Sequence, residues 1–444
     1  MRPSHALLLP ATANALLTTG LLPLLTINIA GLPSILQPNG VPGSKTTNTA
    51  LLGTLLSASP YALIHLQEDF NYHAALYSTT TSFPHRTATS GGVPFGSGLN
   101  TLSRLPSFAS DVRRIKWTTC SSASGADCLT PKGFTFMRLL LASERSGSEA
   151  AYVDVYNLHT DAGGEPADLA ARQANMEQVL GYIDAWSVGN AVVVAGDTNS
   201  RYSRVADTGL RGFLAAGFRD AWVEVERGGV VPGEESLCEN PSLTDWCETV
   251  DKVLFRGGGV VGVGAEGFGY VGFRGEGGGV LTDHNPVAAN LSWTVGGRGL
   301  RQSEFRGGPH GARWFNDVGV LGGKGGRVKT AVVVLRGGSR LDGVGVVLED
   351  GTRLTHGGSG GKEVVLNLAR DEFWVEAELC QGQKDGRTRN FYLRAGTSAG
   401  RSLAAGTRTG DCAVLAAPSG WQVVGFMGQD GDEVDQLALV YAPR

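Results

Sequence analysis

The stretch Ala191-Val192-Val193-Val194-Ala195-Gly196-Asp197-Thr198-Asn199 sets the fold class of this chain. Its apolar first half predicts a β-strand, and its last residues are abruptly polar. In α/β folds ligands bind at the carboxyl ends of strands, because the loops there carry the chemistry. We therefore predict an α/β fold with a functional site around Asp197 and Asn199.

A strand with the same kind of ending precedes this stretch. Residues 151–158 predict a strand that ends in His159, and a helical stripe over residues 169–186 follows it. The chain thus repeats the order of strand, helix and strand, with polar residues at the strand ends.

The N-terminal part shows this order again. Apolar residues alternate with polar ones over residues 24–29, which predicts a strand with Asn28 on its polar side. A helical stretch over residues 47–57 leads to a strand over 61–66, and Glu68 follows that strand.

Two short strands, over residues 252–255 and 286–293, bring three more polar residues to the same region: Asp251, Asp283 and His284. The stretch 257–279 between them is dense in glycine and predicts only edge strands and turns.

Length and composition set limits on these expectations. The 444 residues are enough for two or three domains, and 42% hydrophobic with 18% charged residues is typical of a globular chain. The 65 glycines suit many turns and short strands. A formal net charge of -4 argues against a chain that coats nucleic acid by charge alone.

The N-terminus and the cysteines favour secretion. Residues 1–15 resemble a signal peptide, with a charged start, an apolar stretch and a small-residue cleavage site. No run of about 20 apolar residues is present, so we expect no transmembrane segment. Zinc is a competing use for the cysteines, but no Cys-x-x-Cys pair exists. We expect disulfides in three local pairs: Cys120 with Cys128, Cys238 with Cys247, and Cys380 with Cys412.

The polar residues at the strand ends suit the hydrolysis of a phosphoester. That reaction needs a cation to neutralise developing charge, a group to activate water, and donors around the phosphoryl oxygens. Carboxylate and amide oxygens without cysteine favour Mg²⁺ or Mn²⁺, because hard cations prefer oxygen ligands. Glu68 is the best candidate ligand.

The ordered motifs over about residues 24–293 resemble the endonuclease/exonuclease/phosphatase superfamily, whose members include deoxyribonuclease-I-like enzymes. The fold implied is a four-layer α/β sandwich. The motifs that carry the resemblance are Thr26-Ile27-Asn28, Leu66-Gln67-Glu68, Asn157-Leu158-His159, Gly196-Asp197-Thr198-Asn199 and Thr282-Asp283-His284-Asn285-Pro286.

The resemblance also implies a role for each site residue. Glu68 would hold the metal, with Asn28 and Asp283 in support. His284 would be the general base, oriented by Asp251. Asp197 would position the attacking water, and the phosphoryl group would be stabilised by two further residues, Asn199 and His159. A carboxylate-paired imidazole is more basic and is fixed in one tautomer, which agrees with these roles.

Several substrates are compatible with this resemblance. Residues 152–162 and 98–103 most resemble the sphingomyelinase branch, which implies a lipid headgroup. A nuclease and an inositol-phosphate phosphatase of the same superfamily are alternatives. A pocket for several phosphates would need clustered cations, for which the candidates are Arg113, Arg114, Lys116, Arg201 and Arg204. A further alternative is a carbohydrate-binding protein with an inactive hydrolase part.

The character of the chain changes after residue 295. Residues 296–304 are rich in glycine and predict a linker that permits relative motion. Short β-type runs divided by glycine follow, with no strong helical stripe, so residues 305–444 predict an all-β domain. The expected division is a signal peptide at 1–15, a catalytic domain at 16–295, the linker, and this second domain.

The second domain resembles jacalin-related lectins, through residues 308–311, 342–344, 356–361 and 425–435. That resemblance implies a β-prism of three four-stranded sheets and a partner among glycans. The implied sugar pocket contains Gly431, Asp432, Glu433 and Asp435, with Gly311 near the other binding loop. Asp432 and Glu433 stand where many relatives place other residues.

Overall fold

The computed structural model describes residues 18–36, 40–107, 112–125, 127–275, 277–296, 299–324 and 328–444. The signal peptide predicted at residues 1–15 lies outside them. None of the helices in these ranges combines the length and the hydropathy that crossing a bilayer requires.

The first sheet has six strands. The strand β1 lies in the middle of this sheet, where it runs parallel to β2 and antiparallel to β12. The order is β11 (Val261–Tyr270), β12 (Val287–Val295), β1 (Thr19–Asn28), β2 (Leu63–Gln67), β4 (Asn100–Ser103) and β3 (His85–Arg86). Helices α1 (Lys45–Ala58) and α2 (His73–Thr79) cover its outer face, where their leucines pack against Leu25 and Ile27.

The second sheet contains the stretch that sets the fold class. Its strands in the catalytic part are β5 (Arg113–Lys116), β6 (Gly133–Ser143), β7 (Ala150–His159), β8 (Val192–Asp197), β10 (Asp251–Arg256) and β9 (Arg219–Asp220). Its outer face is covered by α3 (Pro166–Trp186), α4 (Gly209–Ala215) and α5 (Ala221–Glu226). Helix α3 begins with a capping box formed by Glu165 and Asp168. Pro166 is the first residue of this helix, a position where proline is well tolerated.

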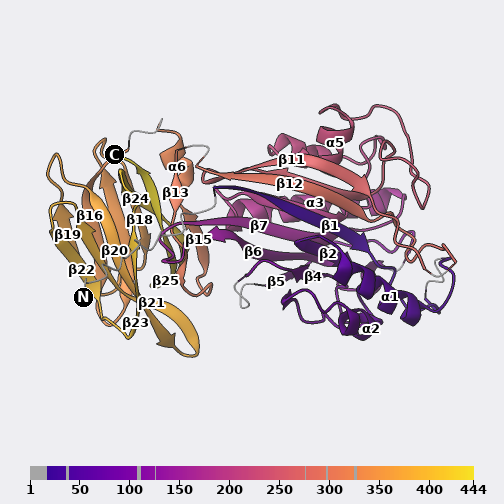
Figure 1. Ribbon diagram of the computed structural model, residues 1–444, viewed down its shortest axis with the longest axis horizontal. Helices are drawn as coiled ribbons and strands as arrows, with labels where there is room; N and C mark the ends of the chain where they lie inside the picture. The colour runs from indigo at the N-terminus through magenta and orange to yellow at the C-terminus, as the bar shows by residue number, and fades with distance from the viewer. Residues whose placement is uncertain are drawn as a thin grey trace, which may run out of the picture.

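The alternation of side chains along the strands explains the layers. On β1, Leu25 and Ile27 face the helices, whereas Leu22 and Leu24 belong to the core between the sheets. On β8, Val193 and Ala195 belong to the same central core. Two sheets packed face to face with helices on both outer faces form a four-layer α/β sandwich, which confirms the predicted fold class (Figure 1).

The C-terminal part is a β-prism, as predicted, with one short helix, α6 (Val318–Gly322). One sheet contains β16 (Thr330–Gly337), β17 (Leu341–Leu348), β18 (Arg353–Gly357) and β19 (Lys362–Asn367). The next contains β20 (Trp374–Lys384), β21 (Arg387–Thr397), β22 (Ser402–Gly406) and β23 (Asp411–Ala416). The third contains β14 (Arg306–Gly307), β15 (Arg313–Asn316), β24 (Trp421–Asp430) and β25 (Val434–Pro443).

The predicted linker at residues 296–304 contains a strand, β13 (Arg301–Gln302), which corrects the expectation of a free connection. Arg301 pairs with Tyr441 of β25, and Gln302 pairs with Ala150 of β7. The third sheet of the prism and the second sheet of the sandwich are therefore one continuous sheet. Figure 1 shows the two parts side by side, with β13 between them.

Candidate active site

The strand pairings bring the predicted residues to one edge of the two sheets. Asn28 pairs with Gln67, the residue before Glu68, where β1 and β2 run parallel. In the second sheet His159 pairs with Asp197 of β8. Asp197 in turn pairs with the first residue of β10, Asp251.

His284, which is partly exposed, forms a pair with the buried Asp251 at this edge. His284 Nδ1 lies 2.9 Å from Asp251 Oδ2, and the side chains are 21% and 2% exposed. Burial would lower the pKa of His284, but the carboxylates of Asp251 and Asp197 raise it well above its usual value. Because Asp251 accepts a hydrogen bond from Nδ1, the other ring nitrogen of His284, Nε2, faces Asp197 and the rest of the site.

Asp197 connects the groups of the site. Its Oδ2 accepts a hydrogen bond from Asn28 Nδ2 at 3.1 Å and lies 3.7 Å from His284 Nε2. Its Oδ1 accepts from the backbone N–H of Asn199 at 3.0 Å. Burial would raise the pKa of Asp197, but the nearby His159 and His284 outweigh burial and lower it, which keeps the carboxylate ionised.

Asn199 and His159 flank Asp197. Asn199 has a left-handed backbone with φ of 45°, and its side chain donates to the carbonyl of Thr160 at 3.2 Å. Burial and the neighbouring cation of Lys132 lower the pKa of His159 to about 3, so its imidazole is neutral.

Lys132 is a site residue that the sequence interpretation missed. Its Nζ lies 3.0 Å from His159 Nε2 and forms an ion pair with Asp127. Asp127 is next to Cys128, whose disulfide with Cys120 closes the loop that presents it. A lone lysine in a loop carries no motif, so only the fold reveals its place.

Glu68 and Asp283 are close enough to influence each other. Burial raises the pKa of Glu68 although the nearby Lys132 and His284 oppose the rise, and the negative charge of Asp283 adds to it. The backbone at Glu68 has a φ of 55°, a conformation that residues with side chains seldom adopt. A divalent cation between two such carboxylates would relieve their repulsion, so this all-oxygen donor set fits Mg²⁺ or Mn²⁺.

Two details refine the predicted metal ligands. Asn28 Oδ1 accepts from the backbone N–H of Ala30 at 3.0 Å, so this oxygen is already engaged within the chain. The structure also groups Asp197, Asp251 and His284, whose ligand atoms lie within 4.8 Å of one another.

A disulfide-closed loop holds the segment that carries His284. The Cys238–Cys247 bond closes this loop, and the backbone N–H of Ser242 within it donates to Asn285 Oδ1 at 2.9 Å. Asn285 Nδ2 donates in return to the carbonyl of Glu239 at 2.8 Å. At the other side, Thr282 Oγ1 donates to the carbonyl of Asn28 at 2.6 Å, which ties the segment to β1.

The predicted sugar-binding residues also lie together. Gly431, Asp432 and Glu433 connect β24 to β25, and Asp435 is near the start of β25. Gly311 packs closely on this turn, since a Cβ there would lie 2.6 Å from the backbone nitrogen of Asp430. Asp432 is exposed, whereas Glu433 and Asp435 are buried and ion-paired. The third disulfide, Cys380–Cys412, joins β20 to β23.

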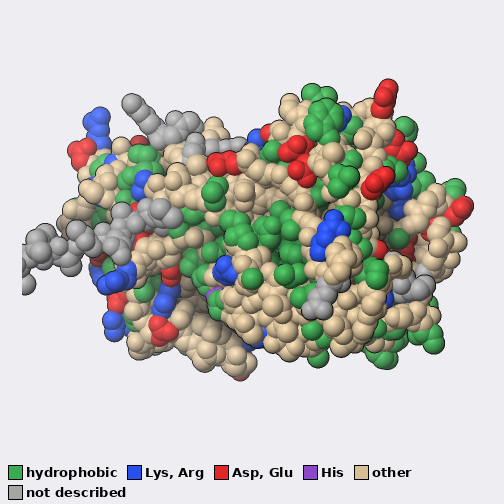
Figure 2. Space-filling view, turned by 45° about the vertical axis from the view of Figure 1, so that its right-hand side comes forward, with side chains coloured by type: hydrophobic (Ala, Val, Ile, Leu, Met, Phe, Trp, Pro, Cys, Tyr) green, Lys and Arg blue, Asp and Glu red, His purple; other side chains and the backbone are tan. Residues whose placement is uncertain are grey.

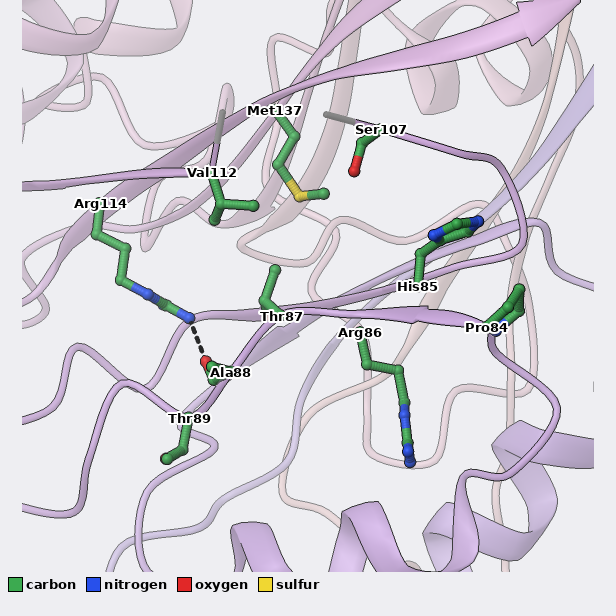
Figure 3. A pocket seen from close by; sticks show the side chains of 10 residues that line it. All are labelled: Pro84, His85, Arg86, Thr87, Ala88, Thr89, Ser107, Val112, Arg114 and Met137. Atoms are coloured by element: carbon green, nitrogen blue, oxygen red, sulfur yellow. Dashed lines mark hydrogen bonds between the residues drawn. The ribbon is translucent and has the colours of Figure 1, made fainter. Parts of the chain in front are cut away.

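One cavity is separate from these two sites. It has a volume of about 410 Å³ and lies beside β3 and β5 (Figure 3). The guanidinium of Arg114 is fixed there by the carbonyl of Ala88 at 2.6 Å. None of the predicted catalytic residues lines this cavity.

Comparison with known families agrees with the two folds. Residues 39–224 match the family described as Endonuclease/Exonuclease/phosphatase family 2, and residues 303–440 match the Jacalin-like lectin domain. The N-terminal part of the chain is thus similar to endonuclease/exonuclease/phosphatase proteins, and the C-terminal part is similar to jacalin-like lectins.

Individual relatives can be named for each part. A sphingomyelinase from Mycobacterium bovis is 36% identical over 283 residues, which cover 61% of this chain and 53% of the relative. The chain thus spans about half the length of the curated relatives it matches.

A magnesium-bound variant of beta toxin from Staphylococcus aureus is 14% identical, with a TM-score of 0.41, over 60% of this chain and 98% of that one. A mannose-specific jacalin-related lectin from Morus nigra in complex with mannose is 22% identical, with a TM-score of 0.28, over 32% of this chain and 93% of that one.

Proposed function

We propose that the chain is a metal-dependent phosphodiesterase that hydrolyses sphingomyelin-type lipids, with a C-terminal domain that binds glycans. One observation carries the proposal: His284 is held by Asp251 at Nδ1, while its Nε2 lies 3.7 Å from Asp197. An imidazole fixed in this way, next to a second carboxylate, can take a proton from a water that Asp197 positions. The hydrolase part would thus be catalytic, not merely structural.

The other residues of the site would act on the phosphoryl group. The side chains of Asn199 and Lys132 would donate hydrogen bonds to the phosphoryl oxygens as charge develops on them. The neutral imidazole of His159, which Lys132 contacts, would also help to stabilise the charge that develops on these phosphoryl oxygens.

Glu68 would hold the Mg²⁺ or Mn²⁺ ion, with Asp283 and Asn28 in support. Asn28 Oδ1 has a second lone pair beside the hydrogen bond that it accepts from Ala30. The bound cation would neutralise charge on the phosphoryl group and lower the pKa of the neighbouring His284 toward that of a working base.

The sphingomyelin proposal rests on the 36% identity to sphingomyelinases. A pocket for several phosphates is not favoured, because the four candidate arginines are engaged elsewhere. Arg113 lies over the ring of Trp186, and Arg114 donates to the carbonyl of Ala88. Arg201 pairs with Glu235, and Arg204 pairs with Asp207. A nuclease is not favoured either, since a formal net charge of -4 does not suit a chain that tracks phosphates. Figure 2 shows Lys and Arg side chains scattered over the face in view.

We propose an extracellular location. The three disulfides are typical of proteins that fold in an oxidising compartment. There, a lectin domain would raise the local concentration of the enzyme at glycan-bearing surfaces without taking part in the chemistry.

A comparison of substrates tests the proposal. The purified full-length chain is assayed with Mg²⁺ on sphingomyelin vesicles, DNA and inositol phosphates in parallel, with Glu177→Gln on the exposed side of α3 as a matched control. We expect hydrolysis of sphingomyelin that the control retains. Faster hydrolysis of DNA or of an inositol phosphate would replace the proposed substrate, and no hydrolysis of any phosphoester would favour the inactive alternative.

A further inference from the structure

The carboxylates of the predicted sugar pocket already have partners within the chain. The guanidinium of Arg389 contacts Asp435 Oδ1 directly, and its Nη1 also lies 3.2 Å from Glu433 Oε1. Two further cations hold Glu433: Arg340 contacts its Oε2, and Lys384 Nζ lies 3.3 Å from its Oε1. A sugar hydroxyl that donates to Asp435 Oδ1 would have to take the place of Arg389.

The fold fixes Arg389 in this position. Arg389 lies on β21 near the start of the strand, directly before Asn390. The side chain of Asn390 donates to the carbonyl of Arg306 at 3.0 Å and to that of Asp435 at 3.3 Å. These bonds tie β21 to the β25 end of the pocket and thereby fix the backbone from which the Arg389 side chain reaches the two carboxylates.

Burial makes the contact hard to displace. The side chains of Asp435 and Glu433 are 2% and 6% exposed, and that of Arg389 is 16% exposed. Hydrogen bonds between ionised groups are roughly twice as strong as neutral ones, and both carboxylates would lose their pairing with the guanidinium. Removing one partner of a buried ion pair leaves an uncompensated charge, so replacing the guanidinium by a neutral hydroxyl is energetically unfavourable.

We infer that Arg389 is an internal occupant of the carbohydrate pocket and excludes neutral hexoses from Asp435. The inference deepens the proposed glycan-binding function and rests on it, since it concerns the same pocket. Arg389 thereby acts as the specificity-determining residue of the C-terminal domain. Loss of its guanidinium opens the pocket to hexoses such as mannose or galactose.

Retention of the full-length chain on mannose-agarose and galactose-agarose tests this inference. Arg389→Gln removes the guanidinium, and Arg389→Met, a second uncharged side chain of similar length, is made in case the glutamine variant is unstable. Arg408→Gln is the control for loss of an arginine, because Arg408 forms a more exposed ion pair with Glu378 of β20, outside the pocket. Thermal unfolding of each variant verifies that it is folded.

We expect the wild-type chain and the control to pass through both resins, and a folded Arg389 variant to be retained and eluted by free hexose. Adding Asp435→Asn should abolish that retention. A wild-type chain that binds hexose through Asp435 overturns the inference but upholds glycan binding. Folded Arg389 variants that neither resin retains also overturn the inference. A glycan array is run in parallel, and absence of binding to it by the wild-type chain and by every variant overturns glycan binding itself.

Discussion

The guanidinium of Arg138, in the catalytic part, lies 3.7 Å from the ring centroid of Trp314, in the lectin part. Arg138 is 1% exposed and is held by both oxygens of Asp154, at 2.7 and 2.9 Å. The residues around this contact belong to one apolar core that extends through both parts. Together with the strand β13, this contact packs the β-prism directly against the α/β sandwich, so the two parts are joined by more than a linker.

Loss of this contact should destabilise the whole chain. Trp314 is 8% exposed, and truncation of a buried aromatic side chain costs about 3–5 kcal/mol. We expect Trp314→Ala to lower the midpoint of chemical unfolding for both parts together. The exposed Trp246, replaced by alanine, is the control. Two separate transitions, with the catalytic part unaffected, would show that the parts unfold independently.

The pair of His284 and Asp251 should control turnover more than binding. General base catalysis contributes about 10²–10⁴-fold, so we expect His284→Ala to lower kcat by that order. Asp251→Asn keeps the shape of the side chain but removes its charge, and it should lower kcat with little change in KM. Steady-state kinetics measure both variants. A normal kcat in either one would exclude this pair from the chemistry.

Lys132 should be needed for turnover, although it belongs to no sequence motif. Removing one donor to a developing oxyanion costs about 10²–10³-fold in kcat, and we expect a loss of this size in Lys132→Met. The exposed Lys362 on β19, changed in the same way, is the control for loss of a lysine. If Lys132→Met retains its activity, the role assigned to this lysine is wrong.

The loop closed by Cys238 and Cys247 should position His284 through Asn285. In Asn285→Ala the backbone donor of Ser242 loses its acceptor, which costs about 1–3 kcal/mol when the group is buried. We expect a lower kcat at an unchanged KM, since the base moves and the substrate contacts do not. Asn290→Ala on the exposed side of β12 is the comparison, and an equal effect there would argue against positioning.

The sequence predicted the strands that end in site residues because each is an apolar run followed at once by a polar group. Residues 191–199 and 151–159 are of this kind, and both became strands that deliver Asp197 and His159. Strand β11 was harder to predict, because its glycines give no side-chain alternation.

Long-range pairings could not be predicted at all. Strand β13 has two residues, which is too few for any periodicity, and its partners lie far away along the chain. The contacts of Lys132 with His159 and of Arg389 with Asp435 likewise join distant segments. Such contacts depend on how the strands pack rather than on any local pattern.

The most direct test of the central claim is sphingomyelin hydrolysis by the wild-type chain and by Glu68→Gln over a titration of Mg²⁺ after removal of metals with EDTA. We predict that Mg²⁺ restores activity to the wild-type chain, and that the variant, which has lost the ligand charge, stays largely inactive or needs far more Mg²⁺. Thermal unfolding without metal verifies that the variant is folded. Hydrolysis that survives EDTA, or a Glu68→Gln variant with the Mg²⁺ response of the wild-type chain, would contradict the account.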